Sequence, residues 1–241
     1  MNTTETLQQM QELKLAGMAR SYRSQLALPI NQQLEGHELI AHLLGEEKLH
    51  RTNDRLAMLL KTARLRFNAS PEQIECSPSR NLTKAQWVTL LEGNYIAQGE
   101  NILIVGSTGC GKSFLACALG HQACLMGIKT RYFNLNRLIE AIAMARTEGS
   151  YMTLINQLEK IPLIILDDFG LQSLNKNVKM ALLQILEDRY EKKSLIITSQ
   201  LPIAKWYEYI DEPTLADAIM DRMSAKCHRI ELTGESRRKK K

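Results

Sequence analysis

The chain has 241 residues, of which 44% are apolar and 24% are charged, and its formal net charge is +5. This balance is ordinary for a globular protein, and no apolar stretch approaches the roughly 18–20 residues that span a bilayer. The first residues carry no signal-peptide pattern, and the five cysteines form no C-x-x-C pair. We therefore expect a cytoplasmic protein without a membrane segment, a zinc site or a disulfide framework.

Positive charge is concentrated in two places. Residues 237–241 supply five basic side chains, so the rest of the chain is formally neutral. Residues 46–66 hold six basic side chains against three acidic ones. Such runs favour polyanions, above all the phosphate backbone of DNA, but a solvated helix face and a solubility tail have the same composition. Charge alone leaves both interpretations open.

The N-terminal part of the chain has a helical pattern. Residues 5–66 show the apolar spacing of helices, with a break at Pro29 and no strand-like alternation. Residues 68–81 contain two prolines and several small polar side chains, which is typical of a linker. The predicted organisation is a helical domain, a linker, a second domain and a basic tail, over residues 1–67, 68–81, 82–236 and 237–241.

From residue 101 onward the pattern changes to short apolar runs separated by helix-length stretches. After a short helix over 82–92, we expect strands at 102–105, 129–133, 163–166, 195–197 and 228–232, and helices over 112–126, 135–146 and 178–190. Strands that alternate with helices of about 10–15 residues predict a three-layer α/β fold with a mostly parallel sheet.

The segment between the first of these strands and its helix carries a specific motif. Residues 106–113 fit G-x-x-x-x-G-K-S, in the strand–loop–helix context of a P-loop. The glycines let the backbone wrap around phosphate groups, Lys112 is placed to neutralise the β- and γ-phosphates, and the Ser113 hydroxyl is placed to ligate Mg²⁺. The motif therefore predicts ATP and Mg²⁺ as cofactors. The predicted cofactor contacts are Gly106, Ser107, Thr108, Gly109, Cys110, Gly111, Lys112, Ser113 and Phe114.

Polar side chains follow two later strands. Asp167 and Asp168 end the third predicted strand. We expect Asp167 to hold Mg²⁺ through its water shell and Asp168 to orient and deprotonate the attacking water. After the fourth strand, Thr198, Ser199 and Gln200 are candidates for contacting the γ-phosphate or this water, with a simple strand-end turn as the alternative.

Arg222 precedes the last predicted strand. An arginine here is placed to reach the γ-phosphate of a neighbouring subunit and to stabilise the charge of the transition state. The alternative is a surface ion pair with Asp221. With Lys112, Asp168, Thr198 and Ser199, Arg222 completes the set of predicted catalytic residues.

With these elements placed, the chain resembles the AAA+ ATPases and, more narrowly, the IstB-like transposition helper proteins of bacterial insertion sequences, which are relatives of the DnaC-type helicase loaders. The resemblance covers nearly the full length. The matching segments are residues 13–19, 101–113, 166–170, 198–206, 221–223, 228–232 and 234–238.

The resemblance implies an ATP-dependent regulator that forms a homo-oligomer on double-stranded DNA, remodels it, and recruits or stimulates the transposase of the same insertion sequence. It also implies nucleotide at subunit interfaces, where Arg222 completes the neighbour's site. Two features depart from the AAA+ pattern: Asp167-Asp168 stands where most members have Asp-Glu, and the usual helical lid has no room after the last strand. A replicative helicase loader and a nucleotide switch without useful turnover are the alternative functions.

Overall fold

The computed structural model describes residues 2–236, so the predicted basic tail at 237–241 lies outside the described residues. The chain divides between Met58 and Leu59 into a helical N-terminal unit and a larger unit that contains the sheet. This division falls earlier than the predicted domain end at residue 67.

The predicted linker at 68–81 belongs to the larger unit. It contains two short 3-10 turns, η2 (Pro71–Gln73) and η3 (Pro78–Arg80), and the side chains of Ala69 and Arg80 are buried. The prolines therefore mark turns in a packed segment, although the same composition is common in linkers.

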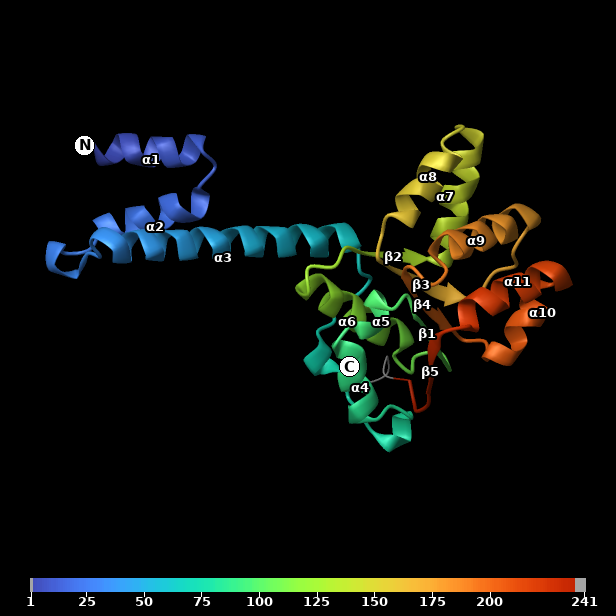
Figure 1. Ribbon diagram of the computed structural model, residues 1–241. Coiled ribbons are helices and arrows are strands. Elements are labelled where there is room, and N and C mark those ends of the chain that lie inside the picture. Colours follow the sequence, from blue (N-terminus) through green and yellow to red (C-terminus); the bar gives the residue numbers. More distant parts are fainter. Residues whose placement is uncertain (1, 237–241) are drawn as a thin grey trace. The chain divides into compact units, whose positions relative to one another are not determined.

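The larger unit is built around a five-stranded parallel sheet with the order β2-β3-β4-β1-β5 (Figure 1). The strands are β1 (Asn101–Gly106), β2 (Thr130–Asn134), β3 (Leu163–Phe169), β4 (Ser194–Ser199) and β5 (Cys227–Leu232). The helices are α4 (Lys84–Leu91), α5 (Asn94–Ala97), α6 (Lys112–Leu125), α7 (Leu135–Thr147), α8 (Tyr151–Glu159), α9 (Lys176–Arg189), α10 (Trp206–Ile210) and α11 (Pro213–Ser224), with a 3-10 turn η4 (Ile203–Lys205). The predicted three-layer α/β fold is confirmed.

Helices cover both faces of the sheet. Because successive side chains of a strand point to opposite faces, β1 sends Ile102 and Ile104 to one side and Leu103 and Val105 to the other. The first pair packs against α4, α5 and α6, and the second pair lies in the cluster formed with α7 to α11 (Figure 1). Burial on both faces explains why these strands are continuous apolar runs in the sequence.

Four helices of the larger unit, α5, α8, α10 and α11, are missing from the sequence-based assignment. Helix α10 has only five residues, too few for a periodic pattern. Helix α8 does carry the signal: Tyr151, Leu154, Ile155 and Leu158 follow the i, i+3, i+4, i+7 spacing, and the last two are buried. No helix among the described residues is both long and apolar enough to cross a membrane.

The N-terminal unit consists of α1 (Thr3–Glu12), α2 (Ala16–Leu26), the 3-10 turn η1 (Ile30–Gln32) and α3 (Gly36–Ala63), whose last turn continues past the division. Its predicted helical character is confirmed.

A buried carboxylate and a glycine fix α2 against α3. The Glu47 carboxylate on α3 accepts hydrogen bonds from the backbone N–H groups of Gly17 (2.8 Å) and Met18 (3.1 Å), in the first turn of α2. It thereby caps a helix whose preceding residue offers no side-chain cap. A Cβ atom on Gly17 would lie 2.7 Å from the backbone oxygen of Glu46, so only glycine permits this approach.

We predict that Gly17→Ala destabilises the packing of α2 on α3, by roughly 1–3 kcal/mol, because backbone atoms of α3 cannot make room for the methyl group. Gly45→Ala is the matched control, since a Cβ atom there meets nothing within 4 Å and the change raises helix propensity. Amide hydrogen exchange over residues 16–26 should be faster in Gly17→Ala and unchanged or slower in Gly45→Ala. Equal exchange in the two variants would contradict the close approach.

Candidate functional site

The candidate site lies at the carboxyl edge of the sheet, where β1 ends and α6 begins. Gly106, Gly109 and Gly111 have φ values of +151°, +85° and +99°, a region that favours glycine, so the loop wraps as the motif predicts. The Lys112 ammonium folds back over this loop and donates to the carbonyl oxygens of Gly106 and Ser107, both at 2.9 Å. The loop and Lys112 together form a cationic cradle at the N-terminus of α6.

Asp167 is the centre of the site. Its side chain is fully buried, and its Oδ1 atom accepts hydrogen bonds from the hydroxyls of Ser113 (2.7 Å) and Thr198. Its Oδ2 atom accepts from the Tyr132 hydroxyl and, at 3.3 Å, from the Arg66 guanidinium. Burial and the bond to Asp167 raise the pKa of Tyr132, which keeps its hydroxyl protonated as a donor. Four side chains therefore hold one carboxylate beside the P-loop.

Asp168 adopts an unusual backbone conformation. Its φ is +66°, and the pairing of β3 with β4 is irregular between Leu166 and Phe169. Its backbone N–H donates to the Thr198 hydroxyl (3.2 Å), and its Oδ2 atom accepts from the Asn134 amide (2.8 Å). The irregularity turns the side chain out of the sheet, where it is 19% exposed against 0% for its neighbour.

The pKa of Asp168 is raised in this position. Burial, and then the adjacent Asp167 carboxylate, raise the pKa of Asp168, while Arg66 at 3.3 Å opposes the shift. A carboxylate with a raised pKa is a better proton acceptor than an ordinary aspartate.

The three candidate residues at the end of β4 make different contacts. Thr198 contacts the acidic pair, as described above. The Ser199 hydroxyl donates to the carbonyl oxygen of Phe169 (2.6 Å) and accepts a backbone N–H, so it holds β4 to β3. Gln200 accepts from the Thr108 hydroxyl of the P-loop (2.6 Å). Thr198 and Gln200 therefore join the site, and Ser199 serves as a fixing contact beside it.

The remaining predicted nucleotide contacts differ in accessibility. Cys110 is buried, and its carbonyl oxygen accepts from the buried Arg80 guanidinium (3.1 Å). The Phe114 ring is partly buried, with its centroid 6.0 Å from that of Phe67. A Cβ atom on Gly109 would lie 2.2 Å from the Ser236 hydroxyl oxygen, so the segment after β5 packs against the loop here.

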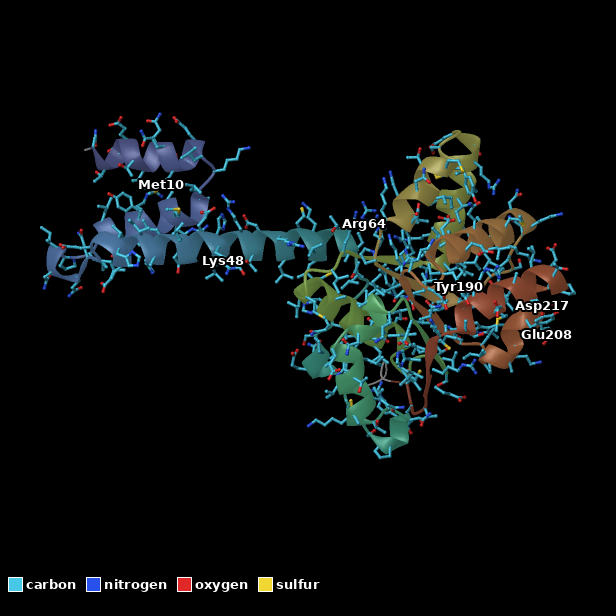
Figure 2. The ribbon with its side chains drawn as sticks, in the orientation of Figure 1. Met10, Lys48, Arg64, Tyr190, Glu208 and Asp217 are labelled. Atoms are coloured by element: carbon cyan, nitrogen blue, oxygen red, sulfur yellow. The ribbon has the colours of Figure 1, made fainter. Side chains whose placement is uncertain are left out.

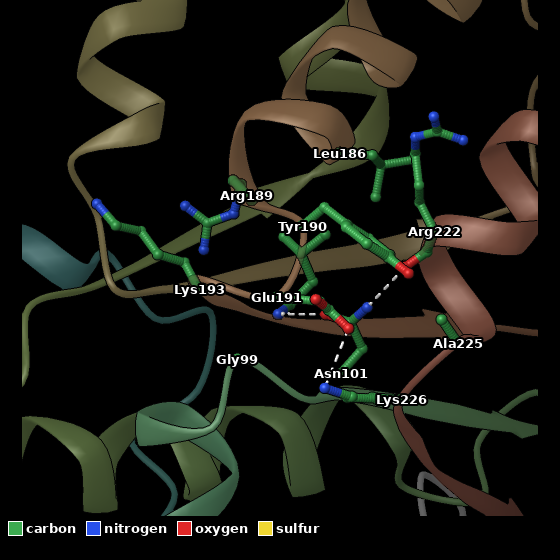
Figure 3. A pocket seen from close by; sticks show the side chains of 11 residues that line it. Gly99, Asn101, Leu186, Arg189, Tyr190, Glu191, Lys193, Arg222, Ala225 and Lys226 are labelled. Atoms are coloured by element: carbon green, nitrogen blue, oxygen red, sulfur yellow. Dashed lines mark hydrogen bonds and ion pairs between the residues drawn. The ribbon is translucent and has the colours of Figure 1, made fainter.

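Arg222 lies near the amino end of β1, whereas the P-loop follows its carboxyl end; Figure 3 shows Arg222 beside Asn101. Its carbonyl oxygen accepts from the Asn101 side chain, at the amino end of β1, and its guanidinium pairs with Glu187. The predicted partner Asp221 is farther, at 4.0 Å. The small pocket beside Arg222 holds about 10 Å³, room for a water molecule at most. Within one chain, Arg222 and the P-loop are not brought together.

Sequence reasoning did not identify Arg66, Tyr132 or Asn134. Tyr132 and Asn134 lie on β2, and Asn134 pairs with Asp167 in the register of β2 and β3. Polar residues at the end of the second strand were the available signal, since strand ends of a parallel sheet meet at one edge. Arg66 had no such signal: its contact with Asp167 spans 101 positions of the chain.

The oxygen atoms of Ser113 and Asp167 are of the kind that Mg²⁺ prefers, and they are already within hydrogen-bond distance of each other. The Arg66 guanidinium against both aspartates indicates that this place favours positive charge. In residues 2–236 no group of three or more His, Cys, Asp or Glu side chains is arranged to hold a metal ion. A metal here would need further oxygen atoms from a bound ligand.

We predict that Thr198→Val destabilises the larger unit by about 1–3 kcal/mol, because Thr198 is fully buried and valine cannot bond to Asp167 or to the Asp168 N–H. Thr198→Ser keeps the hydroxyl and is the matched control. Both tryptophans, Trp87 and Trp206, belong to this unit, so urea unfolding followed by tryptophan fluorescence reports on it. Equal stability of the two variants would show that the hydroxyl bonds contribute nothing.

Solved structures with a similar fold are replication proteins. A crystal structure of the DnaC helicase loader superposes with a TM-score of 0.58 at 20% identity, covering 69% of this chain and 98% of that one. A structure of the replication initiator DnaA bound to AMPPCP and single-stranded DNA gives a TM-score of 0.60 at 20% identity, covering 71% and 52%. The larger unit therefore has the same fold as the DnaC and DnaA structures.

Relatives by sequence come from insertion sequences. An insertion sequence ATP-binding protein of Sinorhizobium fredii is 42% identical over 97% of this chain and 96% of its own length. The ATP-binding protein of insertion sequence IS1162 from Pseudomonas fluorescens is 40% identical, over 84% and 88%. The family described as IstB-like ATP binding protein matches residues 8–241. The site thus stands in a chain that belongs to the IstB-like family of insertion sequence ATP-binding proteins.

Proposed function

We propose that this protein is an ATP-dependent transposition helper that assembles as a homo-oligomer on double-stranded DNA, remodels it, and recruits or stimulates the transposase of its insertion sequence. Membership of the IstB-like family supports the biological setting. The observation that carries the chemistry is the hydrogen bond between Ser113 of the P-loop and Asp167 of β3. This bond joins the two oxygen donors on which a nucleotide-bound metal depends.

In this proposal ATP binds with its phosphates in the loop of residues 106–113. The Lys112 ammonium would exchange the loop carbonyls for the β- and γ-phosphates, and Ser113 and Asp167 would hold Mg²⁺. Mg²⁺, when bound, would neutralise the charge of the phosphates. Arg66, which contacts Oδ2 of Asp167, would compete with the metal for this carboxylate, because two cations repel each other at close range.

Asp168 is the proposed base of hydrolysis. Its raised pKa suits proton transfer from water, and the Asn134 amide orients its carboxylate. Aspartate is one methylene shorter than the glutamate of most AAA+ proteins. We therefore expect Asp168 to reach the attacking water less well and the rate of ATP hydrolysis to be lower. Gln200, fixed to Thr108, and Thr198 are the proposed contacts on the γ-phosphate side of the site.

Arg222 is proposed to act on a neighbouring subunit. Arg222 lies near the amino end of β1, away from the P-loop of its own chain. A head-to-tail assembly would bring it to the nucleotide of the next subunit. The ion pair with Glu187 must then break when the subunits meet, which makes Arg222 available only in the oligomer.

A DnaC-type helicase loader is the second candidate, since the superposition of this chain covers 98% of the solved DnaC chain. The two functions share their ATP chemistry and differ in the partner protein. Co-purification with the transposase encoded beside this gene supports the first, and co-purification with the replicative helicase supports the second.

We predict that Lys112→Ala abolishes ATP binding and ATP-dependent assembly on duplex DNA, and that Arg222→Ala retains ATP binding but loses hydrolysis. Mixing the two inactive variants should restore part of the activity, because an intact P-loop can then meet an intact Arg222 across an interface. Sedimentation with a non-hydrolysable ATP analogue and steady-state ATPase assays with duplex DNA measure the two steps.

Arg229→Ala, an exposed arginine on β5, is the matched control for Arg222 and should keep wild-type turnover. Absence of rescue at every mixing ratio would contradict the role of Arg222 in trans. Turnover that is absent in the wild type with DNA would instead favour a nucleotide switch.

A further inference from the structure

A strongly basic groove runs beside β2, at the edge of the sheet. The groove has a volume of about 900 Å³, and six cationic side chains line it against a single carboxylate, that of Asp168. Arg64, labelled in Figure 2, directly follows the end of α3. The six cations are Arg64, Arg66, Lys129, Arg131, Arg137 and Lys160.

Most of this positive charge has no counter-charge within the described part of the chain. Arg66 pairs with Asp167 and Asp168, but the other five cations form no ion pair among residues 2–236. Arg131 donates instead to the backbone carbonyl oxygen of Thr62 (2.8 Å). Burial, and then the nearby Arg64, lower the pKa of Arg131, as expected where like charges gather. Such a concentration of charge is stabilised by an external polyanion.

The groove has the length of a short stretch of nucleic acid. Among the described strands, β2 pairs with β3 alone and forms one side of the sheet. Lys129 and Lys160 lie at the amino end of these two strands, and Arg66 lies at their carboxyl end. Five strand residues extend about 17 Å. Along the axis of B-DNA this distance is about five base-pair steps, or half a turn, so the groove is long enough to face the phosphates on one side of the helix.

The two aromatic side chains of the groove, Tyr132 and Phe133, are partly buried and pack against the hydrophobic core, which limits stacking on bases. The Arg131 guanidinium lies 5.6 Å from the centre of the Phe133 ring, and the Tyr132 hydroxyl is bonded to Asp167. Stacking on aromatic rings is the usual means of holding an unpaired strand. Contacts here therefore favour the phosphodiester backbone, and a duplex over a single strand.

We propose that the groove along β2 binds the phosphodiester backbone of duplex DNA, through Arg64, Lys129, Arg131, Arg137 and Lys160. This inference rests on the proposed function, which requires DNA binding, and it assigns that binding to the larger unit. The groove ends at Asp168, so the bound backbone lies next to the hydrolytic site.

The test removes three of the groove's charges that bond to nothing else among the described residues: Lys129→Gln, Arg137→Gln and Lys160→Gln in one protein. The matched control removes three exposed lysines elsewhere in the larger unit: Lys84→Gln, Lys176→Gln and Lys192→Gln. Both proteins have the same net charge, and both should bind an ATP analogue as the wild type does. Fluorescence anisotropy with a labelled duplex, between about 50 and 200 mM salt, gives the slope of log K against log salt.

We expect the slope to fall by about two to three in the groove variant and by less than one in the control, at about 0.9 per lost phosphate contact. Equal slopes in the two variants would overturn the assignment. It would also be overturned if, without DNA, the groove variant failed to self-assemble under conditions in which the wild type and the control do. That result would place another copy of the chain in the groove.

A parallel titration with single-stranded DNA separates this proposal from the proposed function. If the groove cations were needed for binding single-stranded DNA and the protein did not bind the duplex, the assignment of the groove to duplex DNA would be overturned. The groove would then still be a site for a phosphodiester backbone, but the proposed function on duplex DNA would be contradicted. Wild-type protein that binds neither form at low salt would overturn both.

Discussion

The arrangement of the larger unit depends on one buried carboxylate. Asp167 is wholly inaccessible to solvent, and an ionised group in such a place is tolerated only when its oxygens are hydrogen-bonded. Its donors come from four segments: Ser113 from α6, Thr198 from β4, Tyr132 from β2, and Arg66 from the chain after α3. The same contacts that make the charge tolerable hold the P-loop to three strands. These contacts also bring the Ser113 and Asp167 oxygen atoms together where the proposed metal would bind.

The two ends of the parallel strands hold different groups. The P-loop and the acidic pair lie where the strands end, while Arg222 and the buried Arg189 lie where the strands begin. Arg189 donates to four backbone carbonyl oxygens there, burial lowers its pKa to about 10, and its buried Nε atom has no partner among the described residues. Arg222 differs in being partly exposed: its guanidinium pairs with the Glu187 carboxylate and donates to the Ala218 carbonyl oxygen at 2.9 Å. An arginine at this end of the strands, away from the P-loop of its own chain, is consistent with the proposed role between subunits.

The fold and the core of the site are predictable from sequence because their signals are local. The P-loop occupies eight consecutive positions, and Asp167 and Asp168 end an apolar run, so neither requires knowledge of strand order. Arg66 joins the site only through tertiary packing across 101 positions of the chain, whereas Tyr132 and Asn134 carry the signal of polar residues at the end of a parallel strand. The domain end was predicted at residue 67, because the division after Met58 falls inside the continuous helix α3, where the helical pattern has no break. Residues 68–81 were predicted as a linker because turns at prolines look alike whether they are solvated or, as here, part of the sheet domain.

The central claim is that Ser113 and Asp167 hold the metal of bound ATP in the place where Arg66 now supplies the positive charge. The most direct measurement is the Mg²⁺ concentration that gives half-maximal binding of a fluorescent, non-hydrolysable ATP analogue. The account predicts that Asp167→Asn raises this concentration by about tenfold or more and that Arg66→Gln lowers it, because the first removes a ligand and the second a competitor. Lys61→Gln, an exposed lysine near the end of α3, is the charge-matched control and should leave it unchanged. The same Mg²⁺ requirement in all four proteins would contradict the account.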